Sequence, residues 1–331
     1  MGVGGAARMI VDVAARLPES LEELLGPGLA GRLDALDVVS RKVMAGKMPG
    51  ERRSKRRGRS VEFDDFREYV PGDDPRHIDW NACARLDRLI VKLFREEEDL
   101  SLRLIVDASA SMQTGTPSKL VFAMRLAMAL AYVGLVKQNR VGIAVFGRER
   151  WPGGVRALSP LRGRGSVQRA GAFLLSVAAD IRASGPGPSG VPSEALRTVL
   201  RGRAERGVSL LVSDFHWDEG AGPALSYLGA GVGLGGADAY ALRVLAPSEL
   251  DPAVDTGLSG DLRLTDVESA RAAEVTVTPA SIEFYRKALE TDTQGLREAG
   301  AARGVALFRT RSDAPVDEVV LGTLRRGGML G

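Results

Sequence analysis

Alternation of strands and helices between residues 102 and 325 limits the possible fold more than any other feature of this sequence. Apolar runs that predict strands lie at 102–106, 140–146, 208–212, 237–245 and 305–309. Helices are predicted at 118–137, 166–183, 193–203, 220–229, 279–303 and 316–325, and a short hairpin at 262–266 and 274–278. Strands joined by helices favour a parallel sheet covered on both faces. We therefore predict an α/β fold, doubly wound around a largely parallel sheet, with ligands bound beyond the carboxyl ends of the strands.

Changes in the pattern divide the chain into four segments. Leucines at three- and four-residue spacings predict one or two helices within residues 1–46. Residues 47–97 start as a basic linker and continue as a charged, aromatic stretch, for which we expect a compact irregular module. We expect the α/β domain to span 98–312 and a C-terminal helix and tail to occupy 313–331.

Composition fits a protein of the reducing cytoplasm. The single cysteine, Cys83, cannot form a disulfide within the chain. Residues 1–13 have too short an apolar run for a signal peptide. Residues 120–136 are apolar but contain Arg125, which favours a buried amphipathic helix over a membrane span. We therefore expect a cytoplasmic protein without a membrane-spanning segment.

A loop rich in hydroxyl groups follows the predicted strand at 102–106. It places Asp107, Ser109 and Ser111 at alternate positions, so that their side chains can point to one locus. One carboxylate and two neutral hydroxyls suit a hard divalent cation, Mg²⁺ above all, and Mn²⁺ or Ca²⁺ could use the same ligands. With so few carboxylates the ion stays electron-poor and can accept an acidic side chain of a partner. The alternative interpretation is that the serines cap the next helix and Asp107 only hydrogen-bonds the loop.

A second acidic residue, Asp214, stands at a strand end of the same kind. The carboxyl ends of parallel strands meet at one edge of a sheet, so Asp107 and Asp214 can face one ion. Here the chain resembles the von Willebrand factor A fold, whose metal-ion-dependent adhesion site (MIDAS) uses Asp-x-Ser-x-Ser, a later Thr and a later strand-end Asp. The resemblance implies Asp107, Ser109, Ser111 and Asp214 as ligands. It puts Ser189 or Ser193, within 188–193, in place of the Thr.

The stretch from Gly58 to Trp80 carries a longer signature. It contains a Glu-Phe pair, then Arg-x-Tyr-x-Pro-Gly-Asp-Asp-x-Arg-x-Ile-Asp-Trp, and continues to Glu96-Glu97. This resembles the bacterial family called domain of unknown function 58 (DUF58), over about residues 40–310. The resemblance implies a non-enzymatic adaptor or chaperone-like partner of a MoxR-type AAA+ ATPase or its client protein. Within the signature, we expect Arg67, Arg76 and Arg85 to form forked bonds with Asp73, Asp79 or Glu62.

Other functions find less support in the sequence. A Mg²⁺- or Mn²⁺-dependent phosphohydrolase could use the same ion to polarise a phosphoryl oxygen. Residues 52–59, six of them basic, could bind nucleic acid through phosphates, but no aromatic residues are interleaved with them. We therefore favour a solvated linker or a docking strip for an acidic partner. The glycine-rich run at 231–236 precedes a strand, which argues against a dinucleotide site. We expect no catalytic residues and no organic cofactor.

Overall fold

The computed structural model describes residues 16–40, 62–95, 100–185, 187–201, 207–233, 237–252, 260–267 and 271–331. The chain divides into two compact units, one of residues 48–99 and one that combines residues 1–47 with 100–331. The basic segment 52–59, for which we predicted a linker or docking strip, lies outside the described residues.

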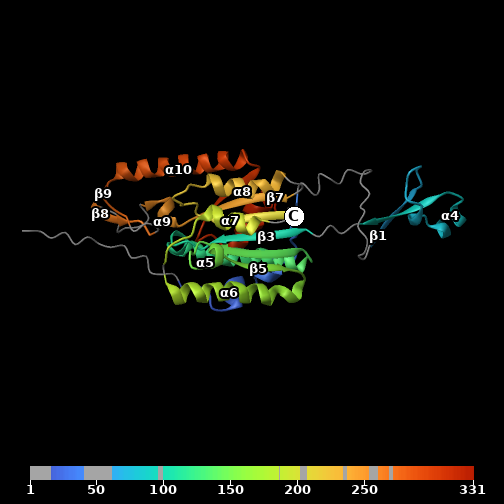
Figure 1. The fold of residues 1–331 in the computed structure, drawn as a ribbon, viewed down its shortest axis with the longest axis horizontal. Coiled ribbons are helices and arrows are strands. Elements are labelled where there is room, and N and C mark those ends of the chain that lie inside the picture. The colour runs from blue at the N-terminus through green and yellow to red at the C-terminus, as the bar shows by residue number, and fades with distance from the viewer. Residues whose placement is uncertain are drawn as a thin grey trace, which may run out of the picture. The chain divides into compact units, whose positions relative to one another are not determined.

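A six-stranded sheet forms the centre of the larger unit (Figure 1). Its strand order is β10-β7-β6-β3-β4-β5, and all neighbouring strands are parallel except the antiparallel pair β4–β5. The strands are β3 (Ser101–Asp107), β4 (Arg140–Phe146), β5 (Val155–Leu161), β6 (Gly207–Ser213), β7 (Ala237–Leu245) and β10 (Val305–Arg311). The predicted α/β, doubly wound, largely parallel fold is thereby confirmed.

Alternation of side chains along the central strands builds a core on each face of the sheet. On β3, Leu104 and Val106 belong to one core and Ile105 to the other, as period-two geometry requires. Helices α5 (Lys119–Val136) and α6 (Val167–Ser184) cover the first face. Helices α7 (Pro192–Leu200), α8 (Gly222–Gly233) and α10 (Pro279–Ala301) cover the second, and Figure 1 shows α6 and α10 on opposite sides of the sheet.

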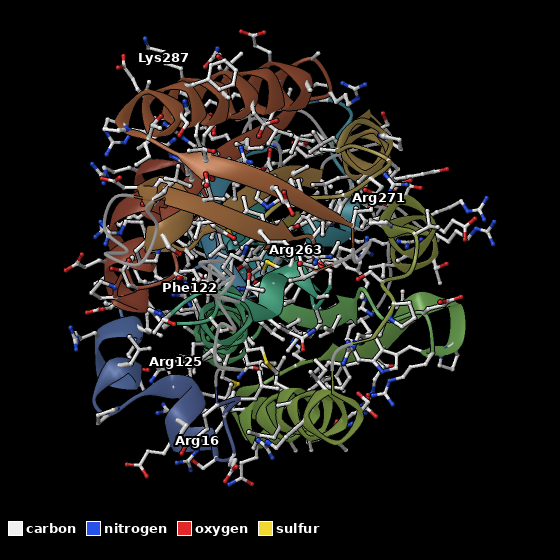
Figure 2. All side chains as sticks on the ribbon, turned by 90° about the vertical axis from the view of Figure 1, so that its left-hand side faces the viewer. Arg16, Phe122, Arg125, Arg263, Arg271 and Lys287 are labelled. Atoms are coloured by element: carbon white, nitrogen blue, oxygen red, sulfur yellow. The ribbon has the colours of Figure 1, made fainter. Side chains whose placement is uncertain are left out.

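Helix α5 is buried on nearly all sides, so the predicted amphipathic pattern is wrong. Its outer side is covered by two short helices, α1 (Leu21–Leu25) and α2 (Leu29–Leu33), which lie beside it in Figure 2. Arg125 reaches out of α5 and donates to the Glu23 carbonyl of α1 at 2.8 Å. Within the described chain, α5 is long and apolar enough to cross a membrane, but 83% of it is buried inside the protein. A helix that is apolar all round fits the middle of a core.

The end of the chain returns to the N-terminal segment. Helix α11 (Val316–Glu318) runs into a π-helical turn (Val319–Leu324), and the last residues pair with 37–39, where Val38 bridges Leu330.

The segment between β7 and α10 contains a short helix and a hairpin. Helix α9 (Pro247–Leu250) follows β7, and β8 (Gly260–Thr265) pairs with β9 (Ala272–Val277) as the predicted hairpin. Short 3₁₀ turns occur at Ser111–Gln113, Pro152–Gly154 and Arg164–Ser166.

The smaller unit is regular, not irregular as predicted. Strand β1 (Glu62–Glu68) pairs antiparallel with β2 (Ile90–Arg95), and a 3₁₀ turn (Pro75–His77) and helix α4 (Trp80–Leu86) connect them. A bulge between Phe63 and Asp65 adds a residue to β1, which hides the alternation expected of a strand. Of the arginines and acids expected to pair here, Arg67 bonds Asp73 at 2.9 Å, whereas Asp79 pairs with Lys92 at 3.0 Å.

Candidate functional site

The loop after β3 is held by a buried carboxylate. Asp107 is fully buried, and its Oδ1 accepts the Ser109 N–H at 2.9 Å. Its Oδ2 accepts the Ser213 hydroxyl at 2.6 Å and the Trp217 indole N–H at 2.8 Å. Burial, and then the neighbouring Asp214 carboxylate, raise the pKa of Asp107 to about 6. The two strand ends are thus tied together through Asp107.

A close backbone approach from β4 fixes the same loop. Gly147 follows β4 with a φ of 102°, and a Cβ atom there would lie 2.5 Å from the Ser109 nitrogen and 2.9 Å from Asp107 Oδ1. Only glycine combines this conformation with this contact. The position therefore helps to set the path of the loop.

Replacing Gly147 with alanine is expected to lower the free energy of unfolding by about 2–4 kcal/mol, from backbone strain and the clash with the loop. Urea denaturation measures this change. Gly26→Ala is the matched control, because Gly26 also has a positive φ of 71° but nothing lies within 4 Å of its Cβ position. Equal losses in the two variants would contradict the close-approach argument.

Three oxygen atoms gather where the loop meets the end of β6. Ser109 Oγ lies 3.1 Å from Ser111 Oγ, which lies 3.3 Å from Asp214 Oδ1. All three residues are buried. Neighbouring oxygens around a Mg²⁺ ion, with bonds of about 2.1 Å at right angles, lie about 3 Å apart. The spacing and the donor set therefore fit a hard divalent cation.

A buried ammonium group lies on the other side of Asp214. Lys119, at the first turn of α5, is fully buried, and its Nζ bonds Asp214 Oδ2 at 2.8 Å and also pairs with Glu249 of α9. Burial acts to lower the pKa of Lys119, but the two carboxylates raise it overall. Burial likewise opposes ionisation of Asp214, yet Lys119 and His216 hold its pKa well below the usual range.

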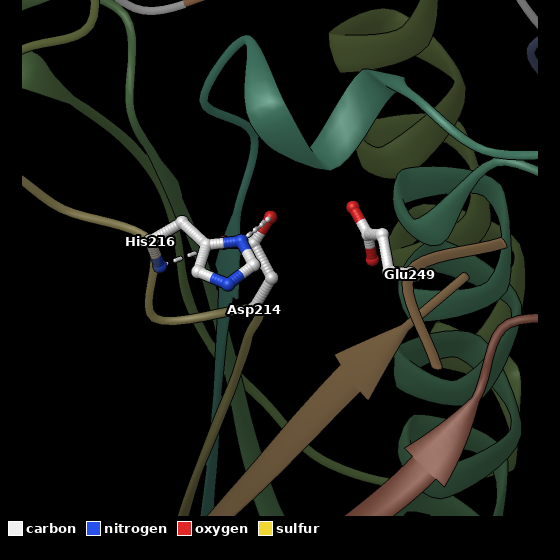
Figure 3. A group of neighbouring side chains, drawn as sticks. All are labelled: Asp214, His216 and Glu249. Carbon is white, nitrogen blue, oxygen red and sulfur yellow. Dashed lines mark hydrogen bonds and ion pairs between the residues drawn. The ribbon is translucent and has the colours of Figure 1, made fainter. Parts of the chain in front are cut away.

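Figure 3 shows Asp214 and His216 side by side, with Glu249 opposite them. The ligand atoms of these three residues lie within 4.8 Å of one another, so the group could hold a metal ion. Because Lys119 Nζ bonds both carboxylates there, a metal ion at this point would have to displace the ammonium group. On the side that faces the serines, Asp214 Oδ1 accepts the His216 backbone N–H at 3.1 Å, and this donor is neutral.

The two serines predicted to replace the Thr have different surroundings. Ser189 lies at the loop, where its Oγ accepts the Ala110 N–H at 3.3 Å. Ser193 begins α7 and bonds Glu219 through both its hydroxyl and its backbone N–H, each at 2.7 Å. The structure therefore brings Ser189, and not Ser193, to Asp107, Ser109, Ser111 and Asp214.

Several residues of the site were not predicted from the sequence. Arg243 is buried on β7, donates to the Asp214 carbonyl at 3.2 Å and to Thr293 Oγ1 at 2.9 Å, and lies 3.3 Å from His216 Nε2. Trp217 packs against Phe146 and Phe215 while it bonds Asp107. Arg243 stands between apolar residues inside a strand, and this position is the signal that could have identified it, because a buried charge needs a partner.

The fold and this edge define the chain as a doubly wound α/β protein with an acidic, hydroxyl-lined site at the ends of its parallel strands. Residues 65–297 match the family model described as "Protein of unknown function DUF58", and the chain belongs to this family. The family resemblance seen in the signature is thereby confirmed.

Relatives of similar length occur in mycobacteria. Uncharacterized proteins of Mycobacterium tuberculosis and Mycobacterium bovis are 27% identical over 316 residues, which cover 92% of each chain. Among solved structures, an aerotolerance-related membrane protein from Bacteroides fragilis is 16% identical, with 69% of this chain and 97% of that chain covered and a TM-score of 0.37. The pilus adhesin SpaC from Lactobacillus rhamnosus GG is 11% identical, with 71% and 30% covered and a TM-score of 0.41.

Proposed function

We propose that this chain is a non-enzymatic adaptor that binds a protein partner through a divalent cation. The cation would be held by Ser109, Ser111 and Asp214, three of the four ligands that the resemblance to the von Willebrand factor A fold implies, with Ser189 beside them. Asp107, the fourth, would orient the loop, because both of its oxygens already accept hydrogen bonds. The observation that carries the proposal is the approach of three oxygens from two strand ends to 3.1 and 3.3 Å. Mg²⁺ is the preferred ion, because it accepts neutral oxygen ligands and retains water at its other positions.

Charge compensation supports binding of an acidic partner. Lys119 already neutralises Asp214, so an ion on the serine side would keep most of its positive charge. A carboxylate from a partner could replace one of its waters and balance that charge. From the family resemblance we propose a MoxR-type AAA+ ATPase, or its client protein, as that partner, and the cytoplasm as the place where they meet.

The test removes the two hydroxyl ligands and leaves the carboxylates in place. A ligand at about a hundred times its Kd stabilises a protein by about 2.7 kcal/mol. We therefore expect Mg²⁺ to raise the melting temperature of the wild-type chain above its value in chelator, and the Ser109→Ala/Ser111→Ala double variant to lose this increase. A pull-down with the ATPase should lose binding with the same double variant and with chelator.

Ser193→Ala is the matched control, since it removes a serine hydroxyl that lies away from the loop. It should keep both the response to Mg²⁺ and the capture of the ATPase. A wild-type chain that shows no thermal response to Mg²⁺, Mn²⁺ or Ca²⁺ would overturn the metal site. ATPase capture that is the same in Mg²⁺ and in chelator would overturn the bridging role.

A further inference from the structure

Positive charge is concentrated around β4, β5 and α6. Residues 138–185 contain eight arginines and two acidic residues, although the whole chain has a net charge of only +3. Arg148 is buried, and the other arginines are exposed or half-buried. They are Arg140, Arg150, Arg156, Arg162, Arg164, Arg169 and Arg182. Asp180 is paired with Arg150, and Glu19 from the N-terminal segment lies 3.5 Å from Arg182, so the excess of positive charge rests on the other arginines. This side of the protein therefore attracts negative charge.

Strand β5 forms the edge of the sheet within this basic region. It pairs with β4 on one side, and no other strand in the described part of the chain pairs with its second side. Such an edge presents backbone N–H and C=O groups to an incoming strand. Pro160 and the irregular register near Leu161 limit the pairing, so that 155–159 is the stretch that remains for it.

A shallow hollow of about 510 Å³ lies beside this edge. Its walls are Trp151, Pro152, Val155, Arg156, Ala157, Phe173 and Asp180. The guanidinium carbon of Arg156 lies 6.0 Å from the centre of the Phe173 ring. Arg169 lies one helical turn before Phe173, on the same face of α6. The hollow thus combines apolar walls with a basic rim.

We propose that β5 binds an extended, acidic segment of a partner protein as an additional strand. The backbone of the segment would pair with 155–159, one apolar side chain would enter the hollow, and acidic side chains would contact Arg156 and Arg169. Main-chain bonds supply affinity in this mode of recognition, and alternate side chains supply specificity. The proposal uses none of the residues of the cation site, so it does not depend on the adaptor function.

A protein segment fits this surface better than a nucleic acid does. Phosphates would also be attracted to the arginines, but a nucleic acid cannot continue a β-sheet. The indole of Trp151 is 5% exposed and donates to Asp180 at 2.7 Å, so it offers no open face for stacking of a base.

The probe is a fluorescein-labelled peptide, Glu-Val-Glu-Leu-Glu-Val-Glu, and its binding to the full chain is measured by fluorescence anisotropy. Three comparison peptides isolate the two contributions. In the first, every glutamate is replaced by glutamine. In the other two, alternate backbone nitrogens are methylated, one peptide for each of the two frames, so that one edge of each peptide cannot pair. We expect the glutamine peptide and one of the methylated peptides to bind at least about tenfold more weakly. Amide exchange at 155–159 should slow when the unmodified peptide is bound.

Substitutions in the protein locate the binding. Arg156→Glu/Arg169→Glu should weaken binding of the acidic peptide by about tenfold or more. Arg297→Glu/Arg286→Glu, with the same charge change on α10 at the opposite side of the sheet (Figure 1), should leave it nearly unchanged. Equal binding of the methylated peptides in both frames would overturn strand addition. Tighter binding of a mixed-sequence single-stranded oligonucleotide of matched charge, lost in the Arg156→Glu/Arg169→Glu variant, would assign the surface to nucleic acid instead.

Discussion

Replacing Lys119 with methionine is expected to lower the free energy of unfolding by about 3–5 kcal/mol in the presence of chelator, measured by urea denaturation. Lys119 is fully buried and is bonded to two carboxylates, Asp214 and Glu249. Methionine fills a similar volume but removes the ammonium group that bonds the buried Asp214 carboxylate, and it leaves His216 as the remaining partner of that oxygen. Removing one partner of a buried ion pair is costly because the remaining charge cannot return to water.

Two further measurements separate this electrostatic cost from a packing defect. Lys119→Met/Asp214→Asn removes the two fully buried charges and should recover part of the lost stability, while Glu249, which is 23% exposed, keeps its charge and some access to water. Added Mg²⁺ should stabilise Lys119→Met more than it stabilises the wild-type chain, since Asp214 would then have lost its ammonium partner. A double variant that is no more stable than Lys119→Met would show that packing dominates.

The central strands were predictable because both of their faces are covered. A strand buried on two faces is a continuous apolar run with abrupt ends, and β4 was predicted at Arg140–Phe146, the bounds that the structure has. Strand β5 was not predicted, since it lies at the sheet edge and contains Arg156, Ser159 and Pro160. The polar residues and proline that protect an edge from aggregation also remove the apolar pattern that indicates a strand.

Part of the candidate site was predictable for a related reason. Asp107 and Asp214 each come at the end of an apolar run, so the topology alone brings them to one edge. Lys119 and Glu249 are 130 residues apart, and no local pattern indicates that α5 and α9 meet. The charge balance of the site depends on this contact, and so it could be read only from the structure. Ser189 and Ser193 were equal candidates in the sequence for a similar reason, because only the path of the loop distinguishes them.

Replacing Arg243 with methionine is expected to lower the free energy of unfolding by about 2–4 kcal/mol and to weaken Mg²⁺ binding, although Arg243 would not touch the ion. The loss would leave the Asp214 carbonyl and Thr293 without this buried donor and would free His216 from one contact.

Asp292→Asn is the matched control. Asp292 pairs with the same guanidinium from a side chain that is 57% exposed, whereas Arg243 is buried. The asparagine removes the carboxylate but keeps the bonds of Arg243 to the Asp214 carbonyl and to Thr293, so this change should cost less than Arg243→Met. Urea denaturation in chelator measures the stability of both variants, and a Mg²⁺ titration followed by melting temperature measures the affinity. If Arg243→Met lost stability in chelator but kept the Mg²⁺ affinity of the wild type, Arg243 would support only the fold. If Asp292→Asn matched it in both measurements, the exposed ion pair, and not the buried bonds at the end of β6, would explain the effect.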